Sequence, residues 1–134
     1  MRTLAGGTVY QLSIHLVLVT KYRYKVINSL ILERLQDIFS ATCQKWECVL
    51  QEFNGEADHV HMLIEINPKV QISAFANNLK TVSSRLIRKE FPEHCSKFYQ
   101  KPVFWKIGYC VVSTGGASLD VVKNYIQNQS GTDE

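Results

Sequence analysis

The sequence lacks the features of several large classes of protein. Its longest apolar stretch, Leu12 to Val19, is interrupted by Ser13 and His15 and falls far short of the roughly 18 residues that predict a membrane span. No basic start followed by a continuous apolar region indicates an export signal, so we expect a cytoplasmic protein with no membrane partner. Seven Gly and three Pro exclude collagenous and low-complexity chains. We therefore expect one globular domain over residues 1–134.

Cysteine motifs and nucleotide-binding loops are also missing. The cysteines Cys43, Cys48, Cys95 and Cys110 form no CxxC pair, and their spacing does not suit a structural zinc site. No GxxxxGK[ST] loop is present, which excludes a P-loop that binds ATP. The formal net charge of +3 allows a nucleic-acid partner but does not indicate one by itself.

Alternating apolar residues predict two strands that carry histidines. In residues 10–20 every second side chain is strongly apolar, and His15 lies on the opposite side. In residues 59–66 the apolar side chains share one face, which places His59 and His61 together on the other. A preceding strand over residues 48–53 completes a hairpin, with its turn between positions 54 and 58.

Helical spacing of apolar residues and turn signals complete the predicted order of elements. The further elements are helices over residues 29–47, 72–91 and 118–129 and a fourth strand over residues 105–113. Asn28 or Ser29 can cap the first helix, Pro92 ends the second, and Gly115 and Gly116 end the last strand. The order β-α-β-β-α-β-α predicts an α+β, ferredoxin-like (RRM-like) split βαβ sandwich, with an antiparallel sheet and an added C-terminal helix.

The histidine strand carries the most informative chemistry. His59 and His61 are two residues apart on a strand, so their imidazoles project from one face and can converge on one metal ion. A half-exposed pair without a metal is the alternative, because two ligands alone do not make a site. We expect Asp58 to point to the opposite face and serve the turn. His15 either contacts this site from a neighbouring strand or is an ordinary half-buried histidine.

The last predicted helix places Tyr125 and Gln129 on one side, one turn apart. Val122 and Ile126 form the packing side instead. An amphipathic helix that shows a tyrosine and a glutamine to solvent is common, so this pair indicates a site only in combination with the histidines.

Four segments in this order resemble the HUH single-tyrosine transposases, the family of the TnpA proteins of small insertion sequences and of REP-associated tyrosine transposases. The segments are HLVLVTKYRYKV (15–26), ADHVHMLIEI (57–66), GYCVVSTGG (108–116) and YIQNQ (125–129). The resemblance implies a DNA transposase that cleaves and rejoins single-stranded DNA through a 5′-phosphotyrosine intermediate and recognises subterminal hairpins. It implies that Tyr125 is the nucleophile and that His59, His61 and Gln129 bind a divalent metal, Mg²⁺ or Mn²⁺.

The resemblance also implies a homodimer in which the histidines of one subunit act with the tyrosine helix of the other. Gly115 and Gly116 can serve as the hinge for such an exchange, because glycine tolerates the backbone angles that a swing requires. A simple turn from strand to helix is the alternative, and the sequence leaves the choice between placement within one subunit and across two open.

Cations and aromatic rings alternate between positions 21 and 25, a composition suited to phosphate contact and base stacking. A solvated turn is the alternative interpretation. The residues predicted to contact DNA are Lys21, Tyr22, Arg23, Lys25, Lys80, Arg85 and Lys101.

Two other functions compete with the transposase hypothesis. An RRM-like RNA-binding module has the same topology, but its central strands expose aromatic rings, whereas this strand exposes His59, His61, Leu63 and Glu65. A domesticated repeat-associated transposase would keep the nicking chemistry and serve the host. Few carboxylates flank the histidines, which disfavours a two-metal nuclease.

Overall fold

The computed structural model describes residues 2–114 and 118–128. Its main sheet has four antiparallel strands in the order β4-β5-β3-β6. The strands are β3 (Leu12–Val19), β4 (Val49–Glu56), β5 (His59–Ile66) and β6 (Cys110–Ser113). The order matches a split βαβ sheet and confirms the predicted α+β, ferredoxin-like fold. It places the histidine strand β5 beside β3, as the sequence suggested.

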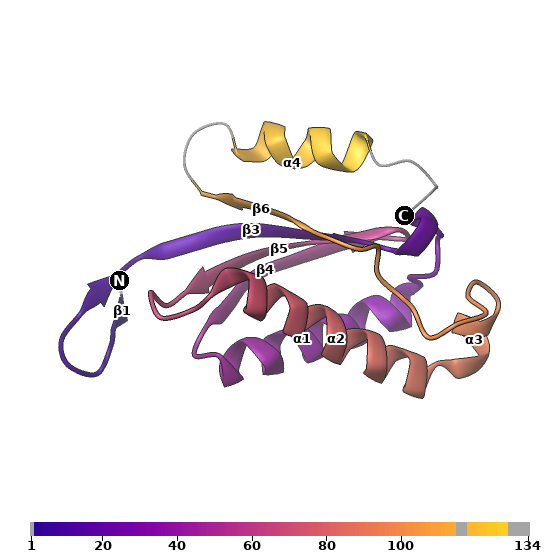
Figure 1. Cartoon of the computed structure of the whole chain (residues 1–134), viewed down its shortest axis with the longest axis horizontal. Coiled ribbons are helices and arrows are strands. Elements are labelled where there is room, and N and C mark those ends of the chain that lie inside the picture. Colours follow the sequence, from indigo (N-terminus) through magenta and orange to yellow (C-terminus); the bar gives the residue numbers. More distant parts are fainter. Residues whose placement is uncertain (1, 115–117, 129–134) are drawn as a thin grey trace.

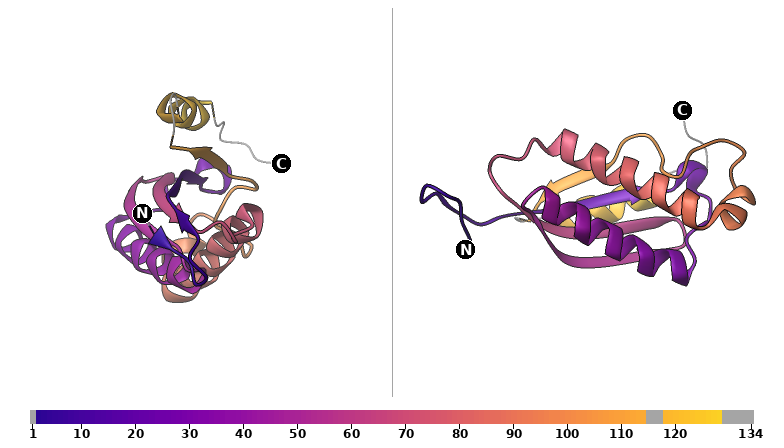
Figure 2. Two further views of the ribbon diagram at one scale, coloured as in Figure 1. Left: turned by 90° about the vertical axis from the view of Figure 1, so that its left-hand side faces the viewer. Right: turned by 90° about the horizontal axis from the view of Figure 1, so that it is seen from below.

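The helices cover the two faces of the sheet unequally (Figure 1). The long helices α1 (Ser29–Lys45) and α2 (Ile72–Glu90) lie on one face, and α4 (Ser118–Gln127) lies alone across the other. The end-on view shows the same three layers (Figure 2). The main core fills the space between the sheet and the two long helices.

Strand alternation determines which face each side chain occupies. Leu16 and Leu18 of β3 and Met62 of β5 are fully buried under the long helices. On the opposite face, a small second cluster joins Val17 and Val19 of β3 to Cys110 of β6 and Val122 of α4. This small cluster packs α4 against the sheet.

The helix ends follow the expected chemistry. Asn28 Oδ1 accepts a hydrogen bond from the backbone N–H of Ile31 at 2.9 Å, so Asn28 is the N-cap of α1. Helix α2 ends at Glu90, and Pro92 begins α3 (Pro92–Ser96), a short helix that the sequence did not predict.

The predicted strand over residues 105–113 is wrong in its first half. Only Cys110–Ser113 pair along β3, while Trp105 makes an isolated bridge to Thr20. Between these two points Gly108 adopts a left-handed conformation with φ of 88°, which turns the chain out of the sheet. The Nζ of Lys80 donates hydrogen bonds to the carbonyls of Lys106 and Gly108, which holds this bend against α2.

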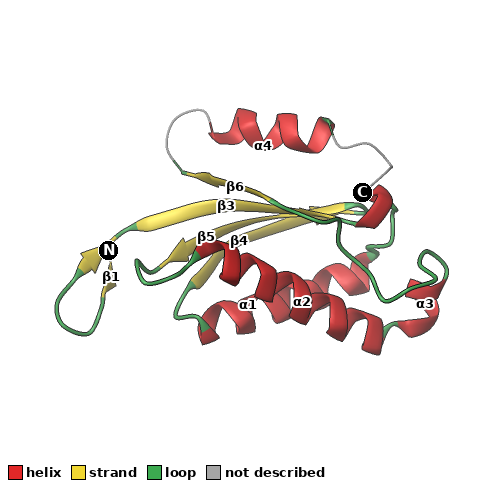
Figure 3. Cartoon of the chain, in the orientation of Figure 1, coloured by secondary structure: helices red, strands yellow, loops and turns green. Residues whose placement is uncertain are grey.

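An N-terminal hairpin was also missed, because its strands are too short to show alternation. It consists of β1 (Arg2–Thr3) and β2 (Val9–Tyr10) and extends beyond the end of the main sheet (Figures 1 and 3). Arg2 forms an ion pair with the buried Glu65 of β5. Between residues 2 and 128, with 115–117 set aside, we find no helix that is long and apolar enough to span a membrane.

Three residues with predicted roles lie outside the described residues. They are Gly115, Gly116 and Gln129. The final helix is described from Ser118 to Gln127, so Tyr125 lies within it.

Candidate active site

His59 and His61 stand at the start of β5 on the face that α4 covers. They line a cavity of about 340 Å³ together with Asn54, Gly55 and Glu56 of β4 and Val122, Lys123 and Ile126 of α4. The His59 ring is nearly buried, whereas His61 is half-buried. The structure therefore confirms that both imidazoles share one face.

The register of the hairpin brings polar groups of β4 to the same cavity. Glu56 pairs with His59 and Asn54 pairs with His61, and directly paired residues on antiparallel strands project to the same side. One carboxylate oxygen of Glu56 lies 3.6 Å from Nε2 of His59. The sequence did not identify Glu56 or Asn54, because their position depends on a two-residue turn at Ala57 and Asp58 whose exact place was left open.

His15 reaches the site from β3. Its Nδ1 lies 2.8 Å from Nε2 of His61, and the two rings stack with centroids 5.0 Å apart. Burial lowers the pKa of His61, and the neighbouring His15 lowers it further. His61 is therefore held neutral at pH 7, the form in which imidazole binds metal ions.

Asp58 lies in the turn, as expected, but it contacts the ring of His59, so the expectation that it points to the opposite face is wrong. Its Oδ1 lies 2.8 Å from Nδ1 of His59, and its Oδ2 accepts a hydrogen bond from Nε of Arg23 at 2.8 Å. Asp58 precedes the first residue of β5, so strand alternation does not govern its direction. Burial by itself would raise the pKa of Asp58, but the hydrogen bonds with His59 and Arg23 outweigh burial and lower it.

The basic turn after β3 packs against the turn of the histidine hairpin. The backbone N–H of Thr20 donates to the carbonyl of Asp58 at 3.0 Å, and the backbone N–H of Lys21 donates to Phe104 at 2.9 Å. The turn contains the short helix η1 (Lys21–Arg23), in which Tyr22 and Arg23 have left-handed φ angles of 59° and 56°. The two turns thus form one unit at the end of the sheet that carries His59.

The residues predicted to contact DNA differ in their exposure and in their contacts within the protein. Lys21 is buried, and its Nζ lies 5.3 Å from the centroid of the Tyr22 ring, with Nζ of Lys101 5.9 Å from the same ring. Lys25 and Arg85 are exposed. Arg23 and Lys80 are engaged within the protein, the first with Asp58 and the second with backbone carbonyls.

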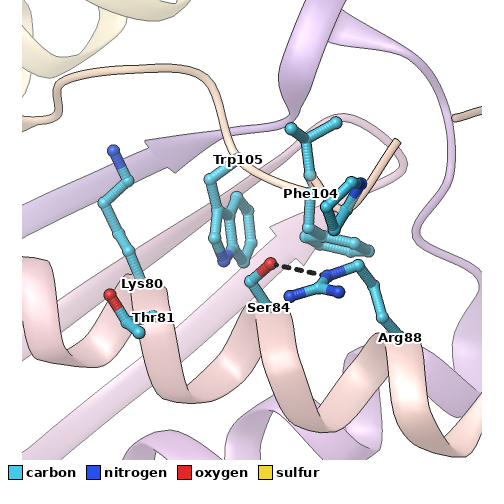
Figure 4. A pocket seen from close by; sticks show the side chains of 8 residues that line it. Lys80, Thr81, Ser84, Arg88, Phe104 and Trp105 are labelled. Carbon is cyan, nitrogen blue, oxygen red and sulfur yellow. Dashed lines mark hydrogen bonds between the residues drawn. The ribbon is translucent and has the colours of Figure 1, made fainter. Parts of the chain in front are cut away.

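A second hollow of about 300 Å³ lies between α2 and the segment around Trp105 (Figure 4). Lys80 and Arg88 contribute cationic side chains to its lining, and Arg88 donates a hydrogen bond to Ser84 at 3.1 Å. The lining of the hollow comes from α2 and from residues 102–105, and α2 lies on the face of the sheet opposite to α4 (Figure 1). The hollow is therefore separate from the histidine cavity.

Tyr125 packs beside the histidine cavity in this chain. It is partly buried and contacts the small cluster of Val17, Val19 and Cys110, whereas Val122 and Ile126 of the same helix line the cavity. Within residues 2–114 and 118–128, no three His, Cys, Asp or Glu side chains are grouped so as to hold a metal ion.

The family of the chain follows from comparison with known proteins. The family model for IS200-like transposases matches residues 8–129. The chain belongs to this family. It is a transposase of the kind encoded by insertion sequences.

The curated relatives of this transposase span most of its length. It is 32% identical over 120 residues to the transposase for insertion sequence element IS200 of Salmonella typhimurium, which covers 90% of this chain and 78% of that one. It is 28% identical over 123 residues to the ISDra2 transposase TnpA of Deinococcus radiodurans, which covers 92% of this chain and 87% of that one.

Solved structures agree with the fold of this transposase. The crystal structure of a candidate transposase from Deinococcus radiodurans R1 has a TM-score of 0.87 and 28% identity, and the match covers 97% of this chain and 98% of that one. A REP-associated tyrosine transposase bound to a REP hairpin has a TM-score of 0.57 and 8% identity, covering 95% of this chain and 67% of that one. The second likeness concerns the fold alone.

Proposed function

We propose that this transposase cleaves and rejoins single-stranded DNA at the ends of an insertion sequence, with Tyr125 as the nucleophile. The observation that carries the proposal is the pair His59 and His61, which opens to a cavity lined by the helix that bears Tyr125. Membership of the IS200-like family supports the same reaction class.

The donor groups at the cavity suit a divalent metal. His59, His61 and Asn54 line it, and their side chains offer two imidazoles and one carboxamide. Mixed nitrogen and oxygen donors fit Mn²⁺ or Mg²⁺ in use, and we propose Gln129 as the third ligand beside His59 and His61. When bound, the ion would neutralise charge that develops on the phosphate.

The chain itself supplies the nucleophile. The Tyr125 Oη forms a bond to phosphorus, the bond from phosphorus to the 3′ oxygen breaks, and the phenolic proton passes through solvent to the released 3′ oxygen, which becomes a hydroxyl. The product is a 5′-phosphotyrosine that keeps the energy of the broken diester, so attack by another 3′-hydroxyl rejoins strands without ATP. A phenol has an ordinary pKa near 10, which is why its attack needs electrostatic assistance.

We further propose that the transposase acts as a homodimer with active sites shared between subunits. In this chain Val122 and Ile126 line the cavity, and Tyr125 packs with them on the cluster of Val17, Val19 and Cys110. A helix donated by a second copy can present Tyr125 to the histidines in a different orientation. This arrangement would also let a residue from the partner complete the ligand set.

A single-stranded DNA with a subterminal hairpin is the proposed substrate. Lys25, Arg85 and Lys101 are exposed cations that can contact its phosphates, and the Nζ atoms of Lys21 and Lys101 lie 5.3 Å and 5.9 Å from the centroid of the Tyr22 ring. Lys80 lines the hollow in Figure 4, and we propose that it contacts DNA there. Its Nζ also donates a hydrogen bond to the carbonyl of Gly108.

Covalent adduct formation tests the nucleophile. The protein is incubated with labelled single-stranded DNA from an insertion-sequence end and Mn²⁺, and adducts are resolved on denaturing gels. Tyr125→Phe should abolish the adduct and retain hairpin binding, whereas Tyr10→Phe, in the distant β2, should react like the wild type. An undiminished adduct with Tyr125→Phe would show that another residue attacks.

Mixing two inactive variants tests the shared site. A heterodimer of Tyr125→Phe and His61→Ala subunits has one intact composite site if the tyrosine helix serves the partner's histidines. Coexpressed subunits, with the heterodimer confirmed by mass spectrometry, should therefore regain adduct formation. A confirmed heterodimer without adduct would place Tyr125 and the histidines of one subunit in the same site.

A further inference from the structure

One carboxylate joins the basic turn to the candidate metal ligand His59. Asp58 accepts a hydrogen bond from Nε of Arg23 at Oδ2 and contacts Nδ1 of His59 through Oδ1, both at 2.8 Å. An ionised carboxylate can only accept, so Nδ1 of His59 must carry a proton. In the neutral form of the ring the lone pair is then on Nε2, the nitrogen that lies near Glu56 at the cavity.

The three groups are shielded enough for this contact to be strong. The exposed fractions of the side chains are 30% for Arg23, 16% for Asp58 and 11% for His59. Water therefore competes less here than at an ordinary surface ion pair. A contrast is provided by Lys25, two residues further along the same turn, whose side chain is exposed.

The backbone of the turn directs Arg23 inward. Tyr22 and Arg23 both have left-handed φ angles, which non-glycine residues adopt only when the surrounding structure holds them. The holding contacts are the bond from Arg23 N–H to Thr20 at 2.9 Å and the two bonds from Thr20 to the Asp58 carbonyl. The same hydrogen bonds therefore attach the turn to the histidine hairpin and set the strained conformation.

We propose that Arg23 is a positioning residue, which acts through Asp58 to fix the ring and tautomer of His59. The inference rests on the proposed function, in which His59 is a metal ligand. It changes the role expected for Arg23 from a phosphate contact to a support for the site. A carboxylate bound to the second nitrogen of a ligating histidine orients the ring and strengthens it as a ligand.

The test compares Arg23→Gln with two matched controls. Lys25→Gln removes the same charge from the same turn, and Arg34→Gln breaks a similar arginine–carboxylate pair with Glu90 on the long helices. Mn²⁺ affinity is measured by calorimetry without DNA, and affinity for single-stranded DNA is measured without metal. Arg23→Gln should bind Mn²⁺ at least about tenfold more weakly. Both controls should keep a Mn²⁺ affinity within about twofold of the wild type, while Lys25→Gln, at a proposed phosphate contact, should lower the affinity for DNA.

Two additional variants test the same contact in case Arg23→Gln does not fold. Asp58→Asn preserves the shape of the carboxylate and should weaken Mn²⁺ binding as Arg23→Gln does, while Arg23→Lys should restore part of the affinity. Circular dichroism confirms that each protein is folded. Unchanged Mn²⁺ affinity in folded Arg23→Gln, with DNA affinity reduced as in Lys25→Gln, would overturn the proposal and make Arg23 a phosphate contact.

A spectroscopic measurement separates this inference from the proposed function. Long-range ¹H–¹⁵N spectra of the metal-free protein at pH 8 report which nitrogen of His59 carries the proton. The wild type should show the Nδ1–H form, and Arg23→Gln should show a mixture with the Nε2–H form. An unchanged tautomer in Arg23→Gln overturns the positioning role. A wild type that binds no Mn²⁺ and forms no adduct would instead refute the proposed function.

Discussion

We predict that the indole of Trp105 stabilises the end of the sheet that carries the candidate site. Its Nε1 donates a hydrogen bond to the hydroxyl of Ser83 at 2.9 Å, and both residues are buried. Trp105 also bridges Thr20, at the start of the turn that holds Asp58. A loss of this anchor should therefore reduce the stability of the structure on which the site is built.

The magnitude follows from which group is left without a partner. Ser83→Ala leaves the buried indole N–H unpaired, which should cost about 1–3 kcal/mol. In Trp105→Phe the Ser83 hydroxyl still donates to the Leu79 carbonyl at 2.6 Å, so the lost hydrogen bond should cost only about 0.5–1.5 kcal/mol, in addition to lost ring contacts. The double variant removes both partners, so its cost should be about 1 kcal/mol less than the sum of the two.

Urea unfolding followed by far-UV circular dichroism measures this cycle, because that signal does not depend on tryptophan fluorescence. Each lost kcal/mol should also lower Tm by roughly 3–5 °C in a chain of this size. Costs that add to within about 0.3 kcal/mol would refute the reasoning, since they would show that the hydrogen bond contributes nothing beyond the two side chains separately.

The remaining predictions concern titration and capping. Burial lowers the pKa of His61, so the unfolded chain binds the proton more readily and the free energy of unfolding should fall as pH drops below about 6.5. His61→Gln should flatten this part of the urea-midpoint profile, and a parallel profile would contradict it. Burial raises the pKa of Cys43 to about 12, so its thiol should not react with an aromatic disulfide reagent at pH 8 until the protein unfolds; rapid reaction of the native protein would disagree. Asn28→Ala should lower the free energy of unfolding in urea by about 1 kcal/mol because α1 loses its cap. Asn28→Ser should keep most of that stability, and equal losses in the two variants would exclude capping.

The faces of the strands could be predicted because strand alternation is a local property. Side chains of β3 and β5 alternate with a period of two residues, so His59 and His61 had to share a face opposite to Met62. The helices followed equally from apolar spacing and from the cap at Asn28. The order of the elements then predicted the ferredoxin-like sheet. In this sheet β3 and β5 are neighbours, which brings His15 close to His61.

The short elements could not be predicted in the same way. The strands β1 and β2 have two residues each, too few for a period. The strand expected from Trp105 was interrupted by the left-handed Gly108, although Trp105 still contributes an isolated bridge. Composition indicated strand throughout that segment, but hydrogen bonds from Lys80 to the bend favour a different path.

The sequence by itself determined that two imidazoles project from one strand face, because that depends only on their spacing. The tertiary structure decided what surrounds them. Glu56 faces His59 through the hairpin register, and Asp58 reaches the same ring from the turn. Arg23, read as a DNA contact from its basic neighbours, turns inward because its left-handed backbone is held by hydrogen bonds to a hairpin 35 residues away. Contacts between groups so distant along the chain form only when the strands of the sheet pair with one another. The local pattern of residues does not specify these contacts.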